Sequence, residues 1–149
     1  MAVVEILARE LTAKIEDPSM PGTFIDIEGI QSINHNPTKT DADTGHFGAA
    51  GRARHIVAER GDEFTLECVY LVDKATGTIP PGHQALRDLA TKIGSDSLGK
   101  FQILDPSGRG IEFMASANVG RPAGGRNDVA TFSVTLTVSG DITEVEPQP

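Results

Sequence analysis

Two long segments alternate apolar and polar side chains with a period of two, and this pattern constrains the fold more than any other feature. One is residues 62–73 (DEFTLECVYLVD) and the other is residues 127–142 (NDVATFSVTLTVSGDI). A period of two is that of a β-strand with one face in a core. In the first segment Val69 and Leu71 make the second face apolar as well. We therefore expect cover on both sides at that end, from a helix or from another subunit.

Shorter segments continue this strand pattern. Residues 111–119 alternate in the same way and are joined to 127–142 by a linker rich in glycine and proline, which predicts a hairpin. Residues 10–16, 23–31 and 99–104 are also predicted strands, and residues 2–9 are an expected N-terminal arm.

One segment, residues 83–93, is predicted to be helical. Its apolar residues recur with helical spacing at Leu86, Leu89, Ala90 and Ile93, and Gly94 is expected to end the helix. The fold predicted is all-β with one flanking α-helix, as a β-sandwich or a partly closed barrel. Residues 1–149 are expected to form a single domain with a flexible C-terminal tail at 141–149.

Charge and cysteine content limit the possible functions. Lys and Arg number 13 and Asp and Glu number 21, for a net charge of −8. Such a chain is not expected to grip nucleic acid, because neutralising phosphates supplies most of that affinity. The single cysteine, Cys68, excludes an internal disulfide and is expected to be a buried, inert thiol. No apolar run approaches the ~18 residues of a membrane span and no signal peptide is visible, so we expect no membrane binding and a cytoplasmic site of synthesis.

The sequence contains no catalytic signature. DADTG (41–45) resembles the start of a calcium loop, but the twelfth position holds Arg52 in place of the closing glutamate. The histidines lack metal-ligand spacing, the phosphate-binding glycine motifs are absent, and no nucleophile is paired with a base. We therefore expect no enzyme activity, no catalytic residue, no metal and no cofactor.

Residues 33–59 are the segment that most needs an explanation. They lack a clear core pattern, and a loop longer than roughly 12–15 residues is usually functional or disordered. Scattered apolar residues such as Phe47 and Ile56 accompany a basic group at Arg52, Arg54 and Arg60 on an acidic protein. Opposite charges on one molecule suit a head-to-tail contact between copies. A solvated mobile loop is the alternative that composition leaves open.

Three runs together resemble the major tail tube protein of long-tailed, siphovirus-type bacteriophages. They are ADTGHFGAAGRARHIVAERGDEFTLECVYLVD, GHQALRDLATKIGSDSLGKFQI and NDVATFSVTLTVSGDIT, and the likeness extends from Val4 to Thr143. It rests on the order and spacing of the runs over a long span.

The resemblance implies a structural subunit whose hexameric rings stack into a hollow tube for genome ejection. It also implies that 33–59 is an inter-ring loop and that the chain ends connect or lie exposed. The residues assigned to inter-ring assembly are Asp41, Asp43, His46, Phe47, Arg52, Arg54 and His55. We expect the arginines to contact acidic groups of the adjacent ring. The implied partners are further copies of the chain, the tape measure protein, the tail tip and the tail terminator, in a virion tail assembled in the host bacterial cytoplasm.

The acidic charge acquires a role in such a tube, because carboxylates on the bore repel the phosphates of passing DNA, which transits without specific binding. The candidate lumen-facing residues are Asp26, Glu28, Glu67 and Glu112, although simple solvent exposure explains each of them equally well. Two alternatives remain. One is the tube subunit of a bacterial contractile injection or secretion system, and the other is a small-ligand-binding β-sandwich.

Overall fold

Seven strands and one α-helix make up the protein, as seen in a computed structural model that describes residues 3–45 and 51–147. The elements in chain order are η1 (Ala8–Glu10), β1 (Thr12–Glu16), β2 (Phe24–Asp26), β3 (Ile30–Asp43), β4 (His55–Val69), α1 (Pro81–Ala90), η3 (Gly94–Ser97), β5 (Leu98–Leu104), β6 (Gly110–Val119) and β7 (Thr131–Val145). The predicted class, all-β with one flanking helix, is confirmed.

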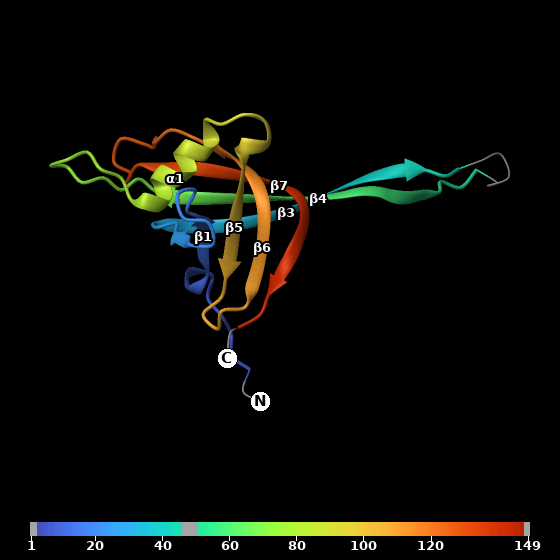
Figure 1. Ribbon diagram of the computed structural model, residues 1–149. Coiled ribbons are helices and arrows are strands. Elements are labelled where there is room, and N and C mark those ends of the chain that lie inside the picture. Colours follow the sequence, from blue (N-terminus) through green and yellow to red (C-terminus); the bar gives the residue numbers. More distant parts are fainter. Residues whose placement is uncertain (1–2, 46–50, 148–149) are drawn as a thin grey trace.

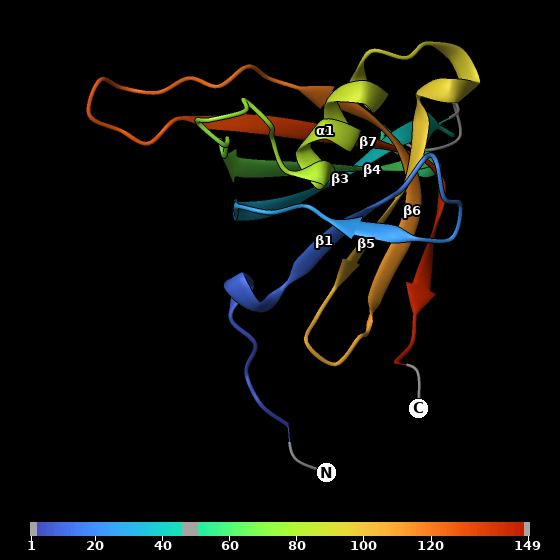
Figure 2. The same cartoon turned by 60° about the vertical axis from the view of Figure 1, so that its left-hand side comes forward.

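The strands form one antiparallel sheet in the order β2-β1-β5-β6-β7-β4-β3, which does not close. Figures 1 and 2 show that β3 and β4 cross β1, β5 and β6 steeply, so the sheet curls around its core instead of forming two separate sheets. β7 joins the two halves, because it pairs with β4 at Thr131–Thr137 and with β6 over Val134–Val145. A register shift beside Glu112 and Met114 marks the bend of this strand.

The core lies on the concave side of the curled sheet and rests on alternate strand residues and on α1. Phe64 stacks on Phe113 with ring centroids 4.9 Å apart, and Phe113 on Phe101 at 5.9 Å, so aromatic contacts link β4, β6 and β5. Cys68 is fully buried, as expected. Burial raises the pKa of its thiol to about 11, and the neighbouring Glu67 carboxylate adds to the shift.

The helix is shorter and earlier than predicted. It spans Pro81–Ala90, with Pro81 in the first turn where its missing N–H costs nothing. The helix ends at the C-cap residue Thr91, whose hydroxyl donates a hydrogen bond to the Asp88 carbonyl at 2.8 Å. Ile93, predicted to lie on the buried face, is 90% exposed, and Gly94 at φ +72° begins η3 instead of closing α1.

His83 fixes the helix to the sheet. It is 1% exposed, and its Nε2 donates to the Glu28 carbonyl at 2.6 Å. Its ring lies edge-on to Phe132 with centroids 5.0 Å apart. Gly82 packs so close to the Asp26 carbonyl that a Cβ there would clash with backbone. The start of α1 is therefore held by a side-chain hydrogen bond and by close backbone approach.

Residues 33–59 differ most from prediction, because most of this segment is regular strand and not an irregular loop. β3 and β4 pair from Ile30–Cys68 to Asp43–His55, with register shifts after Ile30 and after Thr40, as a two-stranded ribbon that projects beyond the core. Between Phe64 and the tip, none of the described ribbon residues is buried and most are polar, so no amphipathic alternation marked this part in the sequence. Backbone hydrogen bonds stabilise it, and these depend little on side-chain type.

The remaining boundaries shift for local reasons. The predicted strand 23–31 is divided, because Gly29 at φ +73° separates β2 from β3. The predicted strand 62–73 begins earlier, at His55, and ends at Val69. The expected C-terminal tail is strand as far as Val145, where it pairs with Gly110 of β6. In the N-terminal arm, residues 3–7 lack secondary structure and residues 8–10 form η1.

Candidate functional site

The end of the β3–β4 ribbon, here called the hairpin tip (residues 41–45 and 51–56), gathers most of the residues assigned to assembly. Asp41 and Asp43 lie on β3, while Arg52 and Arg54 directly precede β4. These four residues and His55 line one open depression. His46 and Phe47, also assigned to assembly, lie outside the described residues.

The carboxylates of the hairpin tip contact neighbouring residues of the same hairpin. Asp41 Oδ2 lies 3.9 Å from Lys39 Nζ and 4.0 Å from His55 Nε2, and Asp43 Oδ1 accepts the Gly45 N–H at 2.7 Å. Arg52 and Arg54 are exposed and make no ion pair with any residue in 3–45 or 51–147. Among the described residues, these two guanidinium groups of the tip therefore have no ion-pair partner.

A second surface, the polar face, is the side of the sheet opposite the core. Side chains that are directly paired in an antiparallel sheet point to the same side. One row on this face crosses four strands by direct pairing through Asp26, Lys14, Gln102 and Glu112. Lys14 Nζ lies 3.7 Å from Asp26 Oδ1, and Gln102 Nε2 donates to Glu112 Oε1 at 3.0 Å. Two of the predicted lumen carboxylates thus share one row.

Glu67 lies on the same polar face, farther along the sheet. It sits between the buried Leu66 and Cys68 and pairs with Ser32 on one side and Ser133 on the other. The neighbouring rows contain only uncharged polar residues and one further glutamate. They are Asn34–Thr65–Thr135–Asn118 and Asn36–Glu63–Thr137–Ser116.

Sequence reasoning missed Glu63 and this network of Ser, Thr and Asn. The signal was present, since Glu63, Thr65 and Glu67 alternate with buried residues at period two. Strands β6 and β7 carry no Lys or Arg at all. The polar face over β4, β7 and the adjoining half of β6 is therefore acidic and free of positive charge.

Glu28 does not join the other three predicted carboxylates. It follows β2, outside any strand, and it lines an open groove with residues 71–73 and 78–81. Its carbonyl accepts the hydrogen bond from His83. The structure therefore separates Glu28 from Asp26, Glu67 and Glu112.

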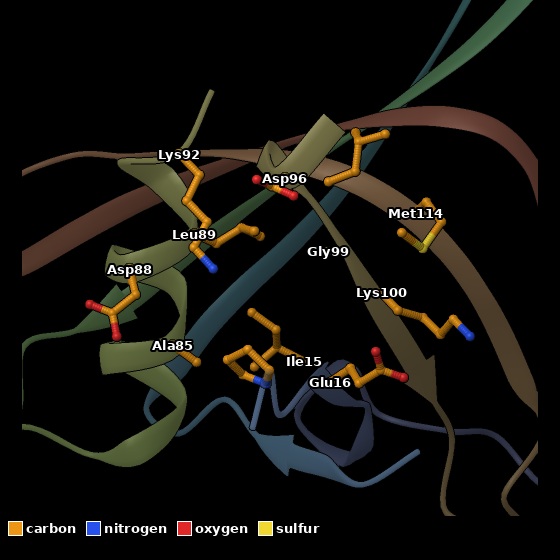
Figure 3. A pocket seen from close by; sticks show the side chains of 12 residues that line it. Ile15, Glu16, Ala85, Asp88, Leu89, Lys92, Asp96, Gly99, Lys100 and Met114 are labelled. Atoms are coloured by element: carbon orange, nitrogen blue, oxygen red, sulfur yellow. The ribbon is translucent and has the colours of Figure 1, made fainter. Parts of the chain in front are cut away.

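A third feature is a cleft between α1, η3 and the ends of β1 and β5 (Figure 3). Its floor is apolar, with Ile15 and Leu89, and charged side chains such as Lys92 and Lys100 stand at its rim. Its volume is about 180 Å³. Pockets for small organic ligands usually hold about 300–1,000 Å³. The cleft is therefore smaller than the usual pocket for a small organic ligand.

The described residues contain no group of three or more His, Cys, Asp or Glu side chains placed to hold a metal ion. No helix within 3–45 and 51–147 has the length and apolar character needed to span a membrane.

The described residues form one open antiparallel sheet with a helix on its core face and a long projecting hairpin. This architecture is that of the class of tail tube folds. No protein-family model matches the sequence, and no curated protein matches it either. Solved structures do match along nearly the whole chain.

The tail of an empty gene transfer agent particle, refined with C6 symmetry, superposes with a TM-score of 0.69 at 14% identity, covering 93% of this chain and 98% of that one. The SPP1 tail tube superposes with a TM-score of 0.70 at 14% identity, covering 97% of this chain and 81% of that one. A tube terminator structure of an extracellular contractile injection system reaches 0.63 at 10% identity, over 97% and 99% of the two chains. These likenesses establish the tail tube fold, which the sequence resemblance had implied.

Proposed function

We propose that this chain is a structural, non-enzymatic subunit of a bacteriophage tail tube, assembling as stacked hexameric rings into a hollow conduit for genome ejection. The observation that carries the proposal is the match over nearly the whole chain to the SPP1 tail tube and to a gene transfer agent tail refined with C6 symmetry. Hexameric stacking of this chain rests on that symmetry.

The open sheet supports lateral assembly. Its two edges are β2, with three residues, and β3, with fourteen. Within the described residues β3 has a strand neighbour on one side only, and an unpaired edge is a ready partner for another strand. Six copies joined through such edges form a ring whose sheets are continuous.

The polar face supports the role of a conduit. We assign Asp26, Glu63, Glu67 and Glu112 on this face to the bore, while Glu28 belongs to the groove described above. Carboxylates repel phosphate, and the Ser, Thr and Asn side chains between them keep the wall hydrated. DNA then passes through the tube without specific binding.

The hairpin tip supports contact between rings. Its residues Asp41, Asp43, His46, Phe47, Arg52, Arg54 and His55 are the proposed inter-ring contact set. The tape measure protein, tail tip and tail terminator are the further proposed partners. The proposed location is the virion tail, assembled in the host bacterial cytoplasm.

The likeness to an extracellular contractile injection system favours a second candidate, a tube subunit of such a device. A tube that carries effector proteins has no need of an anionic wall. The acidic, cation-free polar face over β4 and β7 favours the DNA conduit.

Negative-stain electron microscopy of the concentrated, purified protein tests the proposal. We expect rings or hollow tubes. A protein that remains monomeric at high concentration and binds a small ligand contradicts it.

A further inference from the structure

At the end of the molecule opposite the hairpin tip lies an open groove formed by Glu28, residues 71–73 and residues 78–81, here called the acidic groove. Figures 1 and 2 both show the light-green segment around residues 71–80 on the far side of the core from the end of the β3–β4 ribbon. The two surfaces cannot meet within one copy.

The acidic groove combines apolar side chains with negative charge. Leu71 is 36% exposed and Val72 42% exposed, and Ile79 lies beside them in the lining. Glu28 and Asp73 are the charged residues of the lining, and neither makes an ion pair within residues 3–45 and 51–147.

The acidic groove is held in shape by its own turn. Asp73 N–H donates to the Thr78 carbonyl at 2.9 Å, and Asp73 Oδ1 accepts the Ala75 N–H at 2.9 Å. Pro80 and Pro81 stiffen the return to α1. A Cβ at Gly29 would lie 3.3 Å from Leu71 Cδ1, so Leu71 rests closely on the β2–β3 connection. A preformed surface of this kind loses little conformational freedom on binding.

The hairpin tip has the complementary chemistry. Arg52 and Arg54 are exposed and unpaired in the described part of the chain, and Ile56 beside them is 60% exposed. An exposed isoleucine next to guanidinium groups that have no ion-pair partner in the described residues matches a groove of exposed leucine and valine next to carboxylates that likewise form no ion pair there.

The hairpin is long enough to reach another copy. Phe64 is the first buried residue of β4 counted from the tip, nine residues after His55. At about 3.3 Å per strand residue the ribbon extends ~30 Å beyond the core.

We infer that the hairpin tip of one copy docks in the acidic groove of the next copy. Arg52 and Arg54 pair with Glu28 and Asp73, and Ile56 packs on Leu71 and Val72. The contact joins different surfaces on the two copies, so it repeats from copy to copy without limit. This inference rests on the proposed function and names the acceptor of the inter-ring contact.

A charge swap tests the pairing. Arg54→Glu alone and Glu28→Lys alone should each reduce the amount of sedimentable tube about tenfold, because each places like charges together. The double variant Arg54→Glu/Glu28→Lys should restore assembly to within about twofold of wild type. Arg109→Glu, the same charge change in the exposed β5–β6 turn, is the matched control and should assemble normally. Unchanged circular dichroism spectra establish that each variant is folded.

Disulfide trapping tests the same contact without measuring the amount of sedimentable tube. The variant Arg54→Cys/Val72→Cys should give a ladder of covalent oligomers on oxidation, since each copy offers both ends of the contact. The pair Arg54→Cys/Ser107→Cys, with the second cysteine in the β5–β6 turn, should give no ladder.

The outcomes separate the two claims. If wild type forms tubes but Glu28→Lys assembles normally and no ladder appears at 54/72, the acidic groove is not the acceptor and the proposed function stands. If wild type forms neither tubes nor a 54/72 ladder, both the proposed function and this inference fail.

Discussion

At the scale of single residues, burial determines the chemical state of a side chain in this protein. Cys68 is the clearest example, because the alternation that predicts its strand also predicts that its side chain faces the core. Its pKa is raised to about 11, so at neutral pH it remains a protonated, apolar side chain. A cysteine in that state packs like a small hydrophobic residue and reacts slowly.

The raised pKa of Cys68 predicts a loss of stability at high pH. The pKa of the thiol is near its ordinary value of 9.0 in the unfolded chain and about 11 in the folded protein. Its contribution is therefore complete below pH ~9 and declines by about 1.4 kcal/mol per pH unit as the pH rises toward 11. Urea unfolding from pH 8 to 11 measures this slope, with Cys68→Ala as the control that lacks it. Equal slopes for the two proteins contradict the prediction.

At the scale of elements, the outer part of the β3–β4 hairpin is expected to contribute to assembly and little to the stability of the fold. Beyond Phe64 none of its described residues is buried, so the ribbon adds little to the core. In the proposed assembly, its contribution comes from the exposed residues of its tip, Arg52, Arg54 and Ile56. Natural sheets usually protect long exposed edges, and a long one left open in this way marks a surface that pairs or docks.

Shortening the hairpin should therefore separate folding from assembly. Lys39 and Arg60 are directly paired, so residues 40–59 can be replaced by Asn-Gly in a tight turn. We expect the free energy of unfolding to change by less than about 1 kcal/mol, because none of the removed residues that the structure describes is buried. Tube formation should disappear. Urea titration and electron microscopy measure the two effects, and tubes of ordinary length from the shortened chain would refute the assignment.

At the scale of the whole molecule, the sheet separates two environments. Its core side holds α1 and the aromatic stack, while its polar face holds Glu63, Glu67 and Glu112 among Ser, Thr and Asn. The protein has a net charge of −8, and in the proposed tube this acidic face lines the bore. Under that proposal, the charge of the face governs how the wall interacts with a passing polyanion.

Reversing one charge on the polar face should make the tube adhere to DNA. In a hexameric ring, Glu67→Lys places six ammonium groups on the bore. Tubes of this variant should retain short DNA duplexes at ~50 mM salt and lose about a thousandfold in affinity by ~200 mM, as expected for about six phosphate contacts. Wild type and Asp96→Lys, a matched change in the exposed η3 segment, should retain none. Glu67→Lys tubes that ignore DNA would exclude Glu67 from the bore.

The sequence by itself determined the features that one strand or helix encodes locally. Period-two alternation predicted strands around Phe64–Cys68 and Phe132–Leu136, helical spacing predicted α1, and the burial of Cys68 followed from its place in the alternation. The fold class could also be predicted from the sequence, because it depends on the side-chain pattern. The acidic character of the protein follows from counting its charged residues.

Only the tertiary structure decided which distant residues meet. The outer part of the hairpin showed no alternation in the sequence, because backbone pairing and not side-chain burial holds residues 36–43 to 55–63. The row from Asp26 to Glu112 depends on the register of four strands. Glu28 lies outside this row, because the chain turns at Gly29. Strand order and register depend on contacts between residues far apart in the chain, and a local pattern carries no record of them.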